Sequence, residues 1–201
     1  MPTVVTERPY RTVNAEPLRK RWTRAECDQL EKWAGWDSDH LELIGGELIA
    51  KVPKNRPHAN ALIILLAWAF KTFGEQFVNP EVPIDVSPED TPTSRPEPDL
   101  IVLSTPSNQI TDRCPRPAEL RLVIEVSDST VGFDLTTKAA LYARAQIVEY
   151  WVVDIPAKRL VVHRKPENGV YKDVAWYANT ETVSALAAPD HQFEIATLFP
   201  V

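Results

Sequence analysis

Three charged residues stand at positions where a protein core would ordinarily have apolar side chains. Asp99 opens a short apolar run, Glu125 lies inside a second one over residues 122–126, and Lys138 falls among the apolar positions of a helix-like segment over 134–146. Two carboxylates can hold a hard divalent cation, and an ammonium group can stabilise negative charge on a phosphoryl group. We therefore expect these three residues to form one metal-dependent site that hydrolyses phosphodiester bonds.

The order of the predicted elements allows the three side chains to meet. Asp99 begins one strand and Glu125 lies near the end of the next, so antiparallel pairing would bring both carboxylates to one edge of the sheet. At about 100° per residue, Lys138 shares the broad apolar face of its helix with Leu141 and Tyr142. Helical side chains lean toward the helix N-terminus, so the ammonium group would reach the strand end that carries Glu125.

Each of these residues also has a purely structural interpretation. Asp99 could cap a turn after Pro98, Glu125 could be an ion-pair partner, and Lys138 could extend from the helix edge into solvent. The combination of all three in this order favours the functional interpretation. Asp99 and Glu125 are then the expected ligands of Mg²⁺ or Mn²⁺, and Lys138 is the expected electrostatic catalyst.

Further residues are second-rank catalytic candidates. Glu42 and Glu47 lie in a short alternating segment, and one of them is expected to supply another metal ligand, although the pattern does not choose between them. His58 lies near the start of a long predicted helix and follows several basic residues, which favours a phosphate contact. Asp134 is expected to cap its helix rather than to bind metal.

The remaining segments predict an α+β fold with a mixed sheet flanked by helices. Thr23–Glu26 has the form of a capping box, so a first helix is expected there, with Gly35 able to stop it. Residues 40–52 alternate about two glycines and predict a β-hairpin, and residues 56–73 predict a long helix. Other predicted strands cover residues 76–78, 82–86, 98–103, 122–126, 149–153, 160–163 and 170–177.

Composition indicates one domain, over residues 22–201, preceded by a basic N-terminal arm over residues 1–21. A chain of 201 residues with 44% hydrophobic residues can bury its own core without disulfides. Cys27 and Cys114 lack metal-binding spacing, and no apolar run is long enough to span a bilayer, so we expect a cytoplasmic protein without a membrane partner. The net charge of -6 is unusual for a nucleic-acid-binding protein, although a carboxylate-lined metal site itself adds negative charge.

At its charged residues the chain resembles the PD-(D/E)XK nuclease superfamily. Pro98-Asp99 matches the first element of the motif, and Glu125-Val126 matches the acidic residue of the second. The lysine that usually follows two residues after the acid is replaced by Ser127. A lysine moved to the following helix, as Lys138 is here, is a known variation within the superfamily.

A closer resemblance, over residues 40–165, is to the bacterial Uma-two family of restriction-endonuclease-like proteins. That family has a Glu-Val-x-Ser element, a helix with Asp and Lys four residues apart, and a Glu-Tyr-Trp strand. The corresponding residues here are Glu125-Val126-Ser127, Asp134 with Lys138, and Glu149-Tyr150-Trp151. One departure is Asp128, where the family often has proline.

The resemblance implies a restriction-endonuclease-like core, a divalent metal ion and a nucleic-acid partner, with DNA expected over RNA, and it admits a homodimer. It does not imply that a particular member is active. A rival interpretation is a catalytically inactive nuclease-fold binding or regulatory module, which the acidic charge and the departure at Ser127 favour. A third is a carboxylate-pair hydrolase such as a glycosidase, which needs neither a lysine nor a metal ion.

Overall fold

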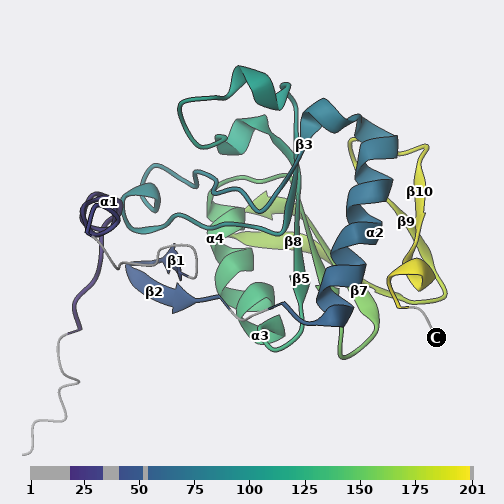
Figure 1. The fold of residues 1–201 in the computed structure, drawn as a ribbon. Coiled ribbons are helices and arrows are strands. Elements are labelled where there is room, and N and C mark those ends of the chain that lie inside the picture. The colour runs from purple at the N-terminus through teal and green to yellow at the C-terminus, as the bar shows by residue number, and fades with distance from the viewer. Residues whose placement is uncertain (1–18, 34–40, 52–53, 200–201) are drawn as a thin grey trace, which may run out of the picture.

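A six-stranded mixed sheet lies at the centre of the computed structural model, which describes residues 19–33, 41–51 and 54–199 (Figure 1). The strand order is β3-β4-β5-β6-β7-β8, and each neighbouring pair is antiparallel except β5 and β6. The predicted α+β class with a mixed sheet is confirmed. The strands of this sheet are β3 (Val78–Pro80), β4 (Leu100–Leu103), β5 (Leu120–Ser127), β6 (Glu149–Asp154), β7 (Arg159–Glu167) and β8 (Val170–Ala178). The other elements are α1 (Arg24–Leu30), β1 (Leu41–Ile44), β2 (Glu47–Ala50), α2 (Arg56–Phe73), α3 (Val131–Phe133), a π-helical turn (Asp134–Lys138), α4 (Ala139–Arg144), β9 (Thr182–Ser184) and β10 (Gln192–Glu194).

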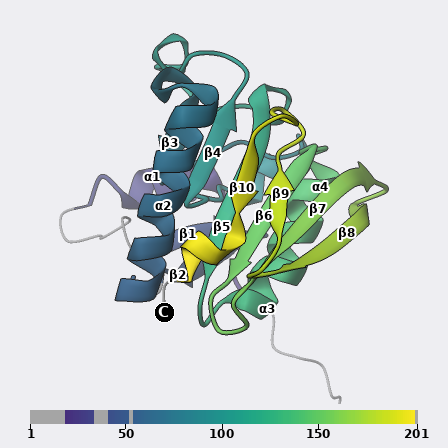
Figure 2. The ribbon, with the colours of Figure 1, turned by 90° about the vertical axis from the view of Figure 1, so that its right-hand side faces the viewer.

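Both faces of the central sheet are covered at β4, β5 and β6. In Figures 1 and 2, α2 and the small β9–β10 sheet lie on one face, and α3, the π-helical turn and α4 lie on the other. Alternate residues of β5 divide between two cores: Leu122 and Ile124 pack with α2, whereas Val123 packs with α4. Burial on both faces explains why β4, β5 and β6 are nearly continuous apolar runs, in which a charged residue is conspicuous.

Local signals in the sequence set the bounds of α2. The side chain of Asn55 caps its N-terminus by accepting a hydrogen bond from the His58 N–H at 3.1 Å, and Pro57 occupies the first turn. Gly74 ends the helix with φ at +90°, a conformation that favours glycine. None of the described helices is both long and apolar enough to cross a bilayer.

The predicted hairpin is present, and α1 is attached to it. Gly45 and Gly46 make its turn with φ of +57° and +82°. The Trp22 N–H donates to the Gly46 carbonyl at 2.8 Å, one residue before the Thr23 capping box that begins α1. The predicted stop at Gly35 lies outside the described residues.

Two predicted strands differ from the structure. In place of a strand over residues 76–78 there is a 3-10 turn, and β3 begins only at Val78. Residues 82–86 form no strand, because Pro83 has no N–H and Ile84 donates its own N–H to a loop carbonyl. Strands β9 and β10 escaped prediction, since three residues are too few to show an alternating pattern.

The helical crossover between β5 and β6 begins earlier than predicted, with α3 rather than at Asp134. Asp134 does not cap the helix, because it is buried within it and accepts hydrogen bonds from the hydroxyls of Ser127 and Thr130, each at 2.7 Å. The Ala139 N–H donates to the carbonyl of Asp134, five residues earlier, which widens this turn. Asp134 and Lys138 both lie on its buried side.

The burial of His163 should make the stability of the fold depend on pH. It is buried between the rings of Tyr150 and Tyr171, its Nδ1 has no hydrogen-bond partner among the described residues, and burial lowers its pKa from 6.5 to about 4. Below pH 6.5 the unfolded chain therefore takes up a proton that the folded chain does not, so stability falls as the pH drops from 6.5 toward 4. The linked loss is at most about 3 kcal/mol.

We expect His163→Phe to remove this contribution while keeping the ring contacts. Urea unfolding measures the free energy of unfolding at pH 7.5 and at pH 4.5. The decrease in this free energy between the two pH values should be smaller for the variant than for the wild type. Equal differences would contradict the assignment.

Candidate active site

The pairing of β4 with β5 brings Asp99 to Glu125. The register places Leu100 opposite Ile124, so the residue before β4 lies beside the end of β5. The Val126 N–H donates to Asp99 Oδ2 at 2.8 Å, which fixes the carboxylate against this strand. The predicted antiparallel arrangement is correct, and it results from the register of two apolar runs.

Lys138 lies within a group of three carboxylates. Its Nζ is 2.8 Å from Glu125 Oε1, 3.0 Å from Glu42 Oε1 and 3.8 Å from Asp134 Oδ1. Tyr142, one turn further along the helix, donates its hydroxyl to Glu125 Oε1 at 3.0 Å. All five residues are buried, so these interactions are only weakly screened by solvent.

Burial and charge act in opposite directions on this group. Burial raises the pKa of Glu125 well above its ordinary value, and the nearby carboxylates add to the rise, although Lys138 opposes it. For Lys138, burial disfavours the charged form, but the carboxylates of Glu125, Glu42 and Asp134 together outweigh it and raise the pKa. Lys138 is therefore held as an ammonium ion, in a position fixed by its partners.

Asp99 has a different environment. Burial opposes its charged form, but His58, the Val126 N–H and Lys54 together favour it and lower the pKa. Lys54 Nζ is 3.1 Å from Asp99 Oδ1, and His58 Nε2 is 3.3 Å from the same oxygen. The outer oxygen of Asp99 thus already faces cationic or proton-donating groups, whereas the inner one is bound to the strand.

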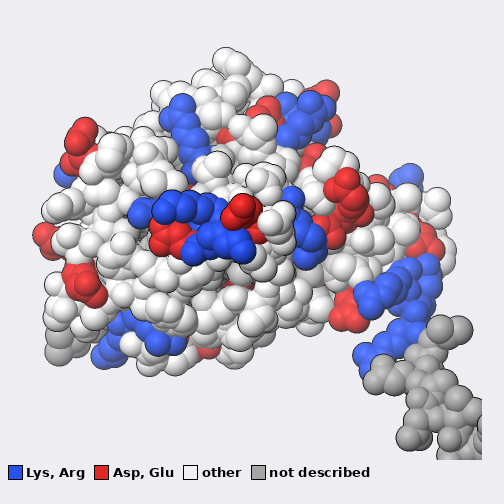
Figure 3. Space-filling model, turned by 180° about the vertical axis from the view of Figure 1, so that it is seen from behind, with Lys and Arg blue, Asp and Glu red and all other residues white. Residues whose placement is uncertain are grey.

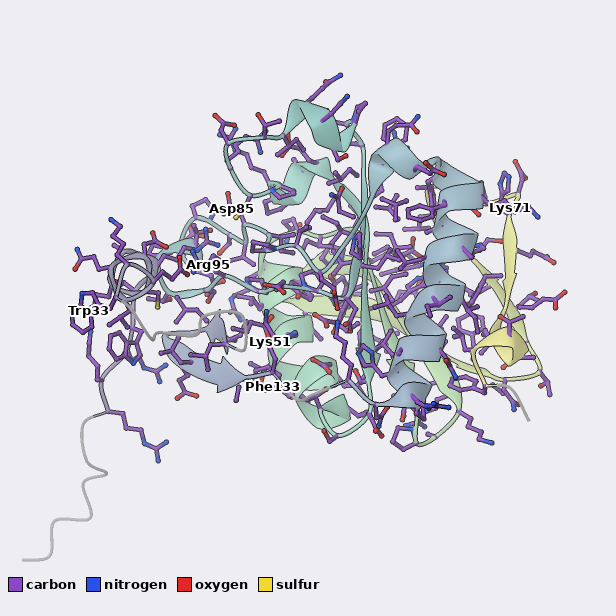
Figure 4. All side chains as sticks on the ribbon, viewed as in Figure 1. Trp33, Lys51, Lys71, Asp85, Arg95 and Phe133 are labelled. Atoms are coloured by element: carbon purple, nitrogen blue, oxygen red, sulfur yellow. The ribbon has the colours of Figure 1, made fainter. Side chains whose placement is uncertain are left out.

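These residues line one cleft between the hairpin, the start of α2 and the helical crossover. Figure 4 labels two residues of its lining, Lys51 after β2 and Phe133 in α3. The predicted site residues in this lining are Glu42, His58, Asp99, Glu125 and Lys138, together with Asp134.

The structure shows which of Glu42 and Glu47 lies in the cleft, a choice that the sequence pattern leaves open. Glu42 is buried, contacts Lys138, and accepts a hydrogen bond from the Glu97 N–H at 2.8 Å. Glu47, on the paired strand, is exposed and lies outside the cleft. The two residues lie on either side of the Gly45-Gly46 turn, so their alternation with apolar neighbours carries no information about which one faces the cleft.

We expect Glu42→Gln to lower the hydrolytic activity expected of this cleft by about tenfold or more, because it removes one of the charges that fix Lys138. Glu47→Gln is the matched control, since it makes the same chemical change in the same hairpin and should leave activity within about twofold of wild type. Initial cleavage rates of the two variants measure this. Similar losses in both variants would contradict the placement of Glu42.

Three residues in or beside the cleft carry no functional prediction from the sequence. The sequence places Tyr142 only on the apolar face of its helix, yet its hydroxyl binds Glu125. Lys54 and Glu81 lie at the mouth, where Lys54 pairs with both Glu81 and Asp99. A signal existed for Lys54, since the stretch from Lys51 to Arg56 is basic, but Glu81 follows Pro80 in a segment typical of a loop.

The donor set fits a hard divalent cation. Asp99 and Glu125 offer carboxylate oxygens at one strand end, and Mg²⁺ characteristically uses one or two carboxylates together with water and substrate phosphate. The described residues contain no group of three or more His, Cys, Asp or Glu side chains arranged as a metal cage. Asp99 and Glu125 would therefore hold the ion with open positions left for other ligands.

Comparison of the sequence with known protein families assigns the chain to one of them. The model of the Uma2 family, described as "Putative restriction endonuclease", matches residues 27–197. The chain belongs to the Uma2 family. The match includes every predicted site residue of this Uma2 protein and confirms the resemblance inferred from its motifs.

A solved structure supports the same fold. A protein from Anabaena variabilis, described as a "putative nuclease belonging to DUF820", superposes with a TM-score of 0.66 at 15% sequence identity, covering 86% of the Uma2 chain and 96% of its own. A search of curated proteins found no significant match.

Proposed function

We propose that this protein is a Mg²⁺- or Mn²⁺-dependent endonuclease of the PD-(D/E)XK type that hydrolyses phosphodiester bonds of DNA. The observation that carries the proposal is the convergence in a single cleft of Asp99, just before β4, Glu125 in β5 and Lys138 in the π-helical turn. The descriptions of the Uma2 family and of the Anabaena protein, both of which name a nuclease, agree with it.

Each side chain has a distinct task in this proposal. Asp99 and Glu125 hold the divalent ion, which when bound would activate water and neutralise phosphoryl charge. Lys138, fixed as an ammonium ion by its carboxylates, orients the attacking water and stabilises negative charge that develops on the phosphate. Glu42 keeps Lys138 in place, and His58 positions the outer oxygen of Asp99.

The direct test is incubation of purified protein with supercoiled plasmid in Mn²⁺ or Mg²⁺, with and without EDTA. We expect nicked and linear products that EDTA abolishes. Absence of cleavage in both metals would overturn the proposal, and cleavage that survives EDTA would favour metal-independent hydrolysis.

A single cleft of this kind would cut one DNA strand at a time, so we also propose that two copies of the chain act together to cleave both strands. A measurement of the molecular mass in solution tests whether the protein is a dimer.

A second candidate is a binding module on an inactive nuclease fold. The face seen in Figure 3 has interspersed acidic and basic side chains, without an extended basic band among the described residues, and the net charge is -6. Calorimetric titration with Mn²⁺ separates the candidates, because the enzyme should bind the ion in a manner that depends on Glu125 and an inactive module should not.

A further inference from the structure

Lys54 bridges two carboxylates at the mouth of the cleft. Its ammonium group lies 3.1 Å from Asp99 Oδ1 and pairs with Glu81 as well. The Lys54 side chain is 39% exposed, whereas the Lys138 side chain, deeper in the cleft, is only 7% exposed. Of these two lysines, Lys54 is the one that can leave its carboxylate without breaking a buried network.

Glu81 is held firmly in relation to Asp99. Its N–H donates to the Asp99 carbonyl at 3.2 Å, so the backbones of the two residues are directly joined. Its φ is +52°, in the left-handed region that residues other than glycine seldom adopt, and such residues concentrate at functional sites. The Glu81 carboxylate is 47% exposed and therefore provides Lys54 with a partner outside the metal-binding pair.

We propose that Lys54 is a displaceable counter-cation of Asp99, and that Glu81 is the carboxylate that retains Lys54 when a divalent cation binds. The inference rests on the proposed metal-dependent function. Without the ion, Lys54 pairs with the outer oxygen of Asp99, beside His58, and so offsets the cost of a buried carboxylate. When the ion binds, it competes with Lys54 for that oxygen, and Glu81 lowers the cost of releasing the lysine. Lys54 and Glu81 are thus positioning residues that act on metal affinity in opposite directions.

The two variants Lys54→Met and Glu81→Gln test this arrangement by calorimetric titration with Mn²⁺ alone. Lys54→Met removes the competitor, so we expect Mn²⁺ to bind about fivefold more tightly. Glu81→Gln leaves Lys54 with Asp99 as its only partner among these carboxylates, so we expect binding about threefold weaker. Both side chains are substantially exposed, and the melting temperatures of the variants should confirm that they fold.

The double variant shows whether Glu81 acts through Lys54. If it does, Glu81→Gln should change Mn²⁺ affinity much less in the Lys54→Met background than in the wild type. If Glu81→Gln weakened Mn²⁺ binding equally in both backgrounds, Glu81 would act on the ion directly or through its charge, and the inference would be overturned. Lys51→Met is the matched control, because Lys51 lines the same cleft but pairs with Glu97 at 2.6 Å. If Lys51→Met increased Mn²⁺ affinity as much as Lys54→Met, the inference would also be overturned. Removal of any positive charge from the cleft would then explain the tighter binding.

Titration of Asp99→Ala with Mn²⁺ distinguishes the role of Lys54 from the metal-dependent function itself. Binding by the wild type that disappears in Asp99→Ala, with unchanged affinity in Lys54→Met, would overturn the role of Lys54 alone. If neither the wild type nor Lys54→Met binds Mn²⁺ in a manner that depends on Asp99, both the metal-dependent function and the inference are wrong.

Discussion

Replacing Lys138 with methionine should destabilise the fold by about 3–5 kcal/mol and abolish cleavage, because it leaves buried carboxylates without their shared cation. Methionine keeps most of the volume of the lysine side chain, so the loss reflects charge rather than a cavity. Glu125, Glu42 and Asp134 would then repel one another in a site that water barely reaches.

Urea unfolding at pH 7.5 and a plasmid cleavage assay measure the two effects of Lys138→Met. Lys71→Met is the matched control, since Lys71 lies near the far end of α2 and is exposed (Figure 4), and it should change stability by no more than about 0.5 kcal/mol. A Lys138→Met protein as stable as the control would show that the carboxylates do not depend on this lysine.

Replacing Asp99 with alanine should lower the cleavage rate by about a thousandfold or more and remove Mn²⁺ binding from the cleft. Of the two proposed ligands, Asp99 is the one whose outer oxygen contacts Lys54, at the mouth of the cleft, and His58. The alanine variant also leaves the Val126 N–H without its acceptor, so part of any loss could come from the fold.

Asp99→Asn separates these causes. The amide oxygen can still accept the hydrogen bond from Val126, so thermal stability should stay close to wild type, but the neutral side chain is a poor ligand for a hard cation. Cleavage should therefore be lost in both variants. Wild-type rates in Asp99→Asn would contradict a metal-binding role for Asp99.

Sequence alone predicted those features that depend on local chemistry. The capping box at Thr23 and the glycines at positions 45 and 46 act within a few residues of their own position, so α1 begins and the hairpin turns where the sequence predicts. The antiparallel approach of Asp99 to Glu125 was also predictable, because two apolar runs with one carboxylate each admit few registers.

The features that sequence did not predict depend on contacts between distant segments. Residues 82–86 look like a strand, but Ile84 and Asp85 donate their N–H groups to carbonyls in two separate loops, and no local pattern identifies these distant partners. Whether Glu42 or Glu47 faces the cleft depends on how the hairpin packs against the crossover helix. The role of Asp134 as a buried acceptor depends on Ser127, which occupies the position of the usual lysine.

The π-helical turn at Asp134–Lys138 has a consequence for comparing related chains. A wide turn contains one residue more than an α-helical turn, so a relative with a regular helix here would be one residue shorter between Glu125 and Tyr142. An alignment would place a gap there, and a motif search with fixed spacing would pair Lys138 with the wrong residue. Relatives of this protein are better matched by tracing which lysine reaches the carboxylates in space than by counting along the chain.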